Sequence, residues 1–175
     1  MQLVPFVVAA CLASLAKCVD MSLYSAGPGV EVRFKTYLQE LYRSAEDPAA
    51  TTDFTDFFTA DGQLKVVTMV ATGAEDIIAL KQELLPVAGN KHWNHLPNVT
   101  TVDSETSTAK TYQVLGVIDT TYDGGNCSRA YYTSLFTVTK DDTGVAELTP
   151  HAGNLVTYDD VVVSPPVSPT DIACA

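Results

Sequence analysis

The chain has 175 residues, of which 46% are hydrophobic, so it can bury the core of one ordinary domain. Its formal net charge is −11, and its 10 lysines and arginines are spread singly along the chain. Proteins that bind nucleic acid or anionic lipid surfaces need clustered basic residues. The composition therefore argues against both, and neither nucleic acid nor a membrane surface is expected as a partner.

The N-terminal segment is typical of a secretory signal. Residues 3–16 form an uncharged apolar run, too short to span a bilayer comfortably, and cleavage after Ala16 or Cys18 would follow the small-residue rule. A buried helix at the start of the domain is the alternative. We expect a secreted, extracellular protein without membrane contact once the signal is removed. Its expected parts are a signal peptide (1–18), a single domain (19–163) and a Pro-rich tail (164–175).

Cysteines and glycosylation sequons fit the same secretory route. An oxidising compartment would allow Cys127 and Cys174 to form a disulfide, with Cys18–Cys174 as the competing bridge if Cys18 survives processing. Asn98 and Asn126 each begin an Asn-X-Ser/Thr sequon, the acceptor pattern for N-glycosylation. We expect a Cys127–Cys174 bridge and glycans at Asn98 and Asn126.

Residues 30–45 carry apolar side chains at helical spacing with polar residues between them. This pattern predicts an amphipathic helix that buries Phe34, Tyr37 and Leu41.

A second, shorter helix is expected to begin near Thr52 and to end at the turn containing Gly62. Residues 64–70 then predict one strand rich in β-branched side chains. Thr72, followed three residues later by a glutamate, matches a capping box for a third helix, which Pro86 ends.

The rest of the chain reads as β-strands separated by polar or glycine-containing turns. Pro150 is expected to bend or interrupt the last of them, because it cannot donate a hydrogen bond within a central ladder. Helices gathered before a sheet indicate an α+β fold. The predicted strands are 92–102, 110–121, 129–140 and 145–163.

The order of these elements resembles the SnoaL-like branch of the nuclear-transport-factor-2-like superfamily over residues 30–160. The resemblance rests on the first helix, the Asp53-Phe54 turn, the helix GAEDIIALKQELLP and the histidine-bearing strand that ends at Asn98. It implies a conical barrel whose curved, mixed or antiparallel sheet wraps the long N-terminal helix around an apolar cavity. Members include cofactor-independent lyases, isomerases and cyclases of polyketide and terpenoid pathways, and non-catalytic modules that bind ligands or dimerise. A small hydrophobic ligand is therefore expected, no cofactor is expected, and a homodimer is left open.

His92 and His95 are the main candidates for chemistry. They lie three residues apart on one strand, so only one of them can face the cavity. The resemblance places the pocket histidine nearer Asn98, which favours His95 as general base or acid, with His92 and Trp93 as substrate-contact candidates. The alternative is that both histidines are surface or structural groups. Fungal scytalone dehydratase relatives use histidines on separate strands, and this sequence does not reproduce that pair.

Four further positions complete the candidate site. Tyr37 lies on the buried stripe of the first helix, where its hydroxyl could reach a ligand, although a core tyrosine is the alternative. Tyr131 and Tyr132 alternate on one strand, so one of them should face inward. Asp119, at a strand end, is a second acid/base candidate, and His151 follows a proline that could turn it toward the ligand.

Two functions remain open from these residues. The first is a secreted, cofactor-independent lyase, isomerase or cyclase acting on a small hydrophobic metabolite, with His95, Tyr37 and Asp119 as its catalytic groups. The second is a secreted module that binds a ligand or a protein through the same pocket or the open sheet face without turnover. No metal site is expected, because the two neighbouring histidines share no strand face and no carboxylate sits at ligand spacing.

Overall fold

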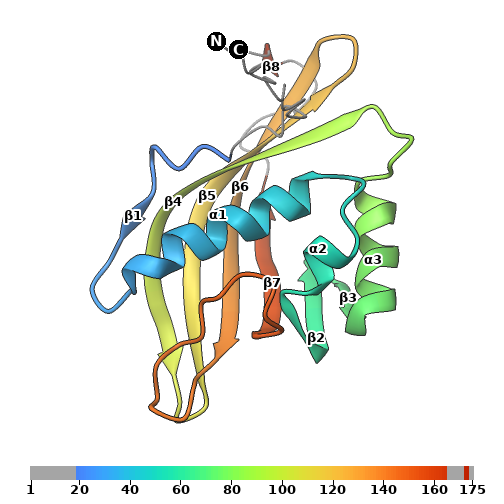
Figure 1. The fold of residues 1–175 in the computed structure, drawn as a ribbon. Coiled ribbons are helices and arrows are strands. Elements are labelled where there is room, and N and C mark those ends of the chain that lie inside the picture. The colour runs from blue at the N-terminus through green and yellow to red at the C-terminus, as the bar shows by residue number, and fades with distance from the viewer. Residues whose placement is uncertain (1–18, 165–171, 174–175) are drawn as a thin grey trace, which may run out of the picture.

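The computed structural model describes residues 19–164 and 172–173 of the chain. Figure 1 shows a curved sheet with the first helix lying along its concave side and two shorter helices at one end. The elements are β1 (Ser25–Ala26), α1 (Val32–Glu46), α2 (Thr52–Thr55), β2 (Phe58–Val66), β3 (Met69–Thr72), α3 (Gly73–Leu84), β4 (Lys91–Glu105), β5 (Ala109–Tyr122), β6 (Asn126–Thr139), β7 (Leu155–Ser164) and β8 (Ile172–Ala173).

The strands form one mixed sheet in the order β1-β4-β5-β6-β7-β2-β3, with β8 paired to β6. Two pairs are parallel, β1 with β4 and β2 with β7, and the other pairs are antiparallel. The β4–β5 register shifts between Pro97 and Thr100. Pro97 has no backbone N–H to donate to the ladder, which favours an irregularity at this point. Such irregularities bend the strands and help the sheet to curve. The predicted α+β fold, with a curved mixed sheet around the first helix, is confirmed.

Helix α1 supplies one wall of the core. Its inward face carries a periodic apolar stripe, and the ring of Phe34 stacks on that of Tyr112 in β5, with centroids 4.0 Å apart. The expected burial of Phe34, Tyr37 and Leu41 is confirmed. The helix begins two residues later than the pattern suggested, and the side chain of Val32 at its start is exposed.

The segment after α1 departs from the prediction. The expected helix from Thr52 to Gly62 is wrong, because α2 ends at Thr55 and Phe58 already belongs to β2. Phe58 pairs with Leu155 of β7, so pairing with a distant strand overrides the local helical spacing of the phenylalanines. The Gly62 region forms an irregularity within β2, where a Cβ would lie 2.9 Å from the carbonyl oxygen of Leu155.

The expected single strand over 64–70 is instead a hairpin of β2 and β3 that turns at Val67. The capping-box prediction is also incorrect in its side-chain part. Thr72 occupies the N-cap position of α3, but its side chain makes no capping hydrogen bond. The Thr72 hydroxyl instead accepts a 3.4 Å hydrogen bond from the amide of Gln63 across the hairpin.

The last predicted strand is shorter than expected. Strand β7 begins at Leu155, and Pro150 lies in the preceding turn, which explains why the β pattern of 145–163 does not form one strand. The buried Asn154 ties this turn down, because its amide donates to the carbonyl of Thr149 at 2.8 Å.

Several predictions about the termini stay untested. Residues 1–18, the tail residues 165–171, and Cys174 lie outside the described residues, so the signal peptide and the Cys127–Cys174 bridge remain predictions. Within the described chain, Cys127 is buried and pairs through its backbone with Ile172 of β8.

Asn98 and Asn126 are both exposed, which leaves them accessible for the predicted glycans. None of the helices in this part of the chain has the length and apolar character to cross a membrane.

The β2–β3 turn offers a test of backbone strain. Val67 is a β-branched residue with φ of 56°, a conformation that costs roughly 1 to 3 kcal/mol for such a side chain. Replacing Val67 with Gly should therefore raise the free energy of unfolding by about 1 kcal/mol in denaturant titrations, after the entropy that glycine adds to the unfolded chain. Val70→Gly, at a position of equal 58% exposure within β3, should lower it. A similar loss for both variants would contradict the strain.

Candidate active site

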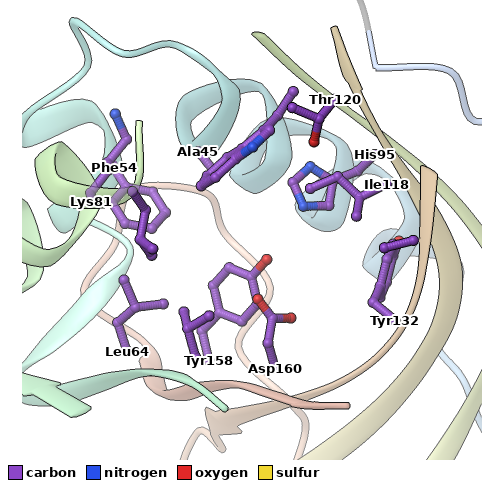
Figure 2. A pocket seen from close by; sticks show the side chains of 14 residues that line it. Ala45, Phe54, Leu64, Lys81, His95, Ile118, Thr120, Tyr132, Tyr158 and Asp160 are labelled. Carbon is purple, nitrogen blue, oxygen red and sulfur yellow. The ribbon is translucent and has the colours of Figure 1, made fainter. Parts of the chain in front are cut away.

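A cavity of about 200 Å³ lies between the C-terminal end of α1, the helices α2 and α3, and the sheet. Figure 2 shows its lining side chains converging from these elements. Most of its wall is apolar, and the polar groups His95, Tyr158 and Asp160 face one another across it. The apolar part of the wall includes Phe54, Leu64, Val66, Leu84, Ile118 and Ala130.

His95 on β4 is the histidine that lines this cavity. Its imidazole is buried and stacks on the ring of Tyr42 from α1, with centroids 4.2 Å apart and planes within 8°. The ring of Tyr132 from β6 meets it edge-on at 5.6 Å. These contacts fix the plane of the imidazole before any ligand arrives.

Glu46, the last residue of α1, determines which ring nitrogen of His95 is free. Its Oε1 atom lies 3.0 Å from Nδ1 of His95 and also accepts a 2.5 Å hydrogen bond from the backbone N–H of His95. A carboxylate accepts hydrogen bonds only, so Nδ1 carries the proton and Nε2 is left unprotonated in the neutral ring. Figure 2 shows one ring nitrogen of His95 directed into the cavity, toward Tyr158 and Asp160. The pair has the arrangement of a general base held in one tautomer.

Asp160 on β7 faces His95 from the opposite side of the cavity (Figure 2). Burial raises the pKa of its carboxyl group to about 6, and the hydroxyl of Ser134, which donates a hydrogen bond to it, works in the opposite direction. Asp160 therefore holds its proton well above the pH at which an ordinary aspartate loses it. Burial also raises the pKa of Tyr158 beside it, so that hydroxyl stays protonated.

Tyr132 is placed by the residue opposite it in the sheet. Gly116 of β5 pairs with Tyr132, and a Cβ at Gly116 would overlap the tyrosine hydroxyl. The hydroxyls of Tyr42 and Tyr132 are buried and interact with each other. Both rings thus act on His95 through packing, and only a glycine at position 116 leaves room for this arrangement.

Lys81 of α3 contributes its stem to the cavity wall and directs its ammonium group elsewhere. The ammonium donates to the backbone carbonyls of Asp47 at 2.5 Å and Ala50 at 3.1 Å. Burial lowers the pKa of Lys81. Its role in the structure is to tie the loop after α1 to α3.

No family model matches this chain, and no curated protein matches it. Several solved structures match it in fold. Aln2 from a Streptomyces species matches with a TM-score of 0.57 at 15% identity, over 79% of this chain and 92% of Aln2. ActVI-ORFA from Streptomyces coelicolor matches with a TM-score of 0.55 at 13% identity, over 76% and 97% of the two chains. A Catenulispora acidiphila protein in complex with S-DNPA matches with a TM-score of 0.54 at 14% identity, over 73% and 92%.

The chain shares its fold with these solved structures, in agreement with the fold that the resemblance to the SnoaL-like branch implied. Within this fold, the cavity lies between the C-terminal end of α1, α3 and the sheet (Figure 2).

The alternation of side chains along β4 and β6 separates the residues of these strands that were candidates for ligand contact. Trp93 lines the cavity on the same strand face as His95, whereas His92 is exposed and lies 2.9 Å from Asp123. On β6, Tyr132 lines the cavity and Tyr131 is 55% exposed. His92 and Tyr131 are therefore corrected from cavity residues to surface residues, as strand alternation requires.

Three other candidates lie away from the cavity. Asp119 does not face it, because its neighbours Ile118 and Thr120 do, and its carboxylate pairs with Arg129 at 2.6 and 2.8 Å. Tyr37 is a core residue whose hydroxyl donates a 2.8 Å hydrogen bond to Asn154.

His151, the third, lies in a turn with φ of 56°, and its ring is 4.3 Å from that of Phe57. It faces a separate surface hollow that also includes Asp56. The structure therefore removes all three residues, Asp119, Tyr37 and His151, from the candidate site.

Four residues of the site were missed by the sequence reasoning: Glu46, Tyr42, Tyr158 and Asp160. A signal for the last two was present, because an acidic residue within the β-branched run of β7 is unusual and Tyr158 shares its strand face. Tyr42 lies one helical turn before Glu46, but it is off the stripe used to predict α1. For Glu46 the local sequence offers no such signal, since an acidic residue at a helix end is ordinarily solvated.

Proposed function

We propose that the protein catalyses cofactor-independent proton transfer on a small, mostly apolar molecule, as a lyase, isomerase or cyclase. The observation that carries this proposal is the buried His95–Glu46 pair facing the Asp160 carboxyl group across an apolar cavity. A buried carboxyl group with a raised pKa, such as Asp160, that converges with a second polar group on one cavity is characteristic of acid–base sites.

The chemistry needs one base and one acid, and each is present. Nε2 of His95 takes a proton from the carbon next to a carbonyl group, and the carboxyl group of Asp160 gives its proton to the carbonyl oxygen, which yields an enol. If the enol is conjugated, the imidazolium can return its proton to a different carbon while the enol O–H returns its proton to Asp160, and the product is an isomer. In a lyase the Asp160 proton goes instead to a hydroxyl on the carbon beyond the one that loses its proton: that C–O bond breaks, water leaves and a carbon–carbon double bond forms. In both routes the imidazolium and the carboxylate formed in the first step balance one another in charge.

The solved structures support the proposal that a protein of this fold binds a small molecule. The Catenulispora protein with this fold is in complex with a small molecule, S-DNPA. Polyketide- or terpenoid-like metabolites remain the substrate classes that the family resemblance suggests for such a cavity.

Hydrogen–deuterium exchange tests the proposal without knowledge of the natural substrate. Ketones that bind are incubated with the protein in D₂O, and loss of the signal of the proton next to the carbonyl is followed by NMR. Exchange should be faster than in buffer at equal pH. A panel of ketones that bind without accelerated exchange would contradict catalysis and would support the alternative, a ligand-binding module without turnover.

Glu46 gives the same assay a structural control. Glu46→Ala removes the acceptor for Nδ1 of His95 and should slow exchange by roughly tenfold to a hundredfold, less than loss of the imidazole itself. Glu46→Gln keeps an oxygen acceptor and should recover part of the rate, with a changed pH profile because the negative charge is gone. Equal rates for wild type and Glu46→Ala would show that this carboxylate does not position the base.

A further inference from the structure

The size of the cavity limits what it can enclose. Its volume is about 200 Å³, whereas an apolar cavity of about 150 Å³ holds one benzene molecule and sites for drug-sized ligands occupy roughly 300 to 1,000 Å³. One ring with two or three small substituents therefore fits. A fused ring system would have to extend out of the cavity and would lose contact with its apolar wall.

The distribution of polar atoms sets the orientation of the occupant. Phe54, Leu64 and Ile118 present only carbon, while His95 on one side faces Tyr158 and Asp160 on the other (Figure 2). Nε2 of His95 can accept a hydrogen bond, and the Tyr158 hydroxyl and the protonated Asp160 carboxyl group can donate one. The matching molecule has an apolar body with an acceptor oxygen on the side of Tyr158 and Asp160 and a donor group on the side of His95.

The charges exclude an anionic group. Among the described residues, Lys81 is the one lysine or arginine that lines the cavity, and its ammonium is already held by the carbonyls of Asp47 and Ala50. A bound carboxylate or phosphate would therefore find no cation and would face Asp160. A cationic group would lose its hydration against a mostly apolar wall, and Asp160, the one acidic residue among the described residues that lines the cavity, is already bound by the Ser134 hydroxyl.

We propose, on the basis of the function proposed above, that the substrate is an uncharged, single-ring molecule that carries a ketone and a hydroxyl group. The ketone oxygen lies at Asp160 and Tyr158, and the hydroxyl or the acidic C–H lies at Nε2 of His95.

Trp93 provides a built-in probe, because it is the only tryptophan in the chain and it lines the cavity. Its fluorescence is titrated at about pH 6 with 4-hydroxycyclohexanone, cyclohexanecarboxylate, cyclohexylamine and the four-ring ketone androstane-3,17-dione, with calorimetry as a second readout. The single-ring ketone should give a saturable change, and the other three should bind about tenfold more weakly or not at all. Tighter binding of the carboxylate, the amine or the four-ring ketone would overturn the proposed class, and so would failure of all four to bind.

Two variants locate the binding. Ala130→Leu narrows the cavity and should weaken binding of the single-ring ketone, whereas Tyr131→Leu, on the opposite face of the same strand, should leave it unchanged. Equal effects of the two variants would place the ketone elsewhere.

Failure of the substrate class and failure of the function give different results. If large or charged probes bind best while ketone exchange still depends on Glu46, proton-transfer catalysis is supported and the single-ring substrate class is wrong. If the single-ring ketone binds best but no ketone exchanges its protons faster than in buffer, the ligand class is supported and the proposed catalysis is wrong.

Discussion

Replacing His95 with Gln is expected to slow protein-dependent exchange of ketone protons by roughly 10²- to 10⁴-fold, the usual contribution of a general acid or base. The imidazole is the group in the cavity whose basic nitrogen is free, because Nδ1 is bound to Glu46 at 3.0 Å and burial keeps the Tyr158 hydroxyl protonated. Glutamine roughly preserves the side-chain volume and its amide can still donate to Glu46, so the change removes the base with little loss of packing. The rate is measured by NMR in D₂O under ketone saturation.

His92→Gln is the matched control, because it removes the same functional group three residues away. The side chain of His92 is 53% exposed and contacts Asp123, so its loss should leave the exchange rate unchanged. Equal losses in the two variants, or an unchanged rate in His95→Gln with a normal unfolding midpoint, would sink the assignment of His95 as the base.

The second large effect concerns stability and Asp160. Its pKa rises from 3.8 in the unfolded chain to about 6 in the folded protein, so the folded state binds more protons between these values. The free energy of unfolding should therefore fall as the pH rises from below about 4 to above about 6, by about 3 kcal/mol in total for this group alone. Asp160→Asn cannot ionise and should remove this part of the slope, which makes the variant more stable than wild type above about pH 6. Denaturant titrations across this range measure the difference.

The groups around Asp160 that shift its pKa determine which variant is the control for Asp160→Asn. The hydroxyl of Ser134 and the nearby His95 lower the pKa of Asp160, and Asp159 raises it. Burial is the largest cause, so Asp159→Asn, at a partly exposed position 3.9 Å from Lys65, should keep the slope. A pH dependence that survives in Asp160→Asn and disappears in Asp159→Asn would show that Asp159, and not Asp160, is the titrating group.

Local periodicity predicted much of the fold and one half of the site. The 3.6-residue spacing of α1 identified its buried face, and strand alternation on β4 separated His92 from His95. The same alternation applied to β7 would have placed Tyr158 and Asp160 on one face. These patterns depend only on neighbours along the chain, which is why a single sequence can reveal them.

The features that were missed depend on contacts between distant residues. The helical spacing of Phe54 and Phe58 was genuine, but pairing of Phe58 with Leu155 ended the helix. Tyr37 was predicted for the cavity from its place on the buried stripe, and only the turn containing Asn154 explains why its hydroxyl points into the core. Glu46 and His95 are 49 residues apart, so no local pattern connects them.

The position of Glu46 at the end of α1 makes the length of that helix a determinant of activity. Each residue of an α-helix advances about 1.5 Å and turns about 100°, so an insertion or deletion of one residue within α1 would swing the Glu46 carboxylate away from His95. Single-residue insertions in the exposed turn at Gly124 and Gly125 would leave that geometry unchanged. Natural relatives that keep this chemistry should therefore tolerate variable loop lengths but conserve the spacing between the core residues of α1 and its terminal glutamate.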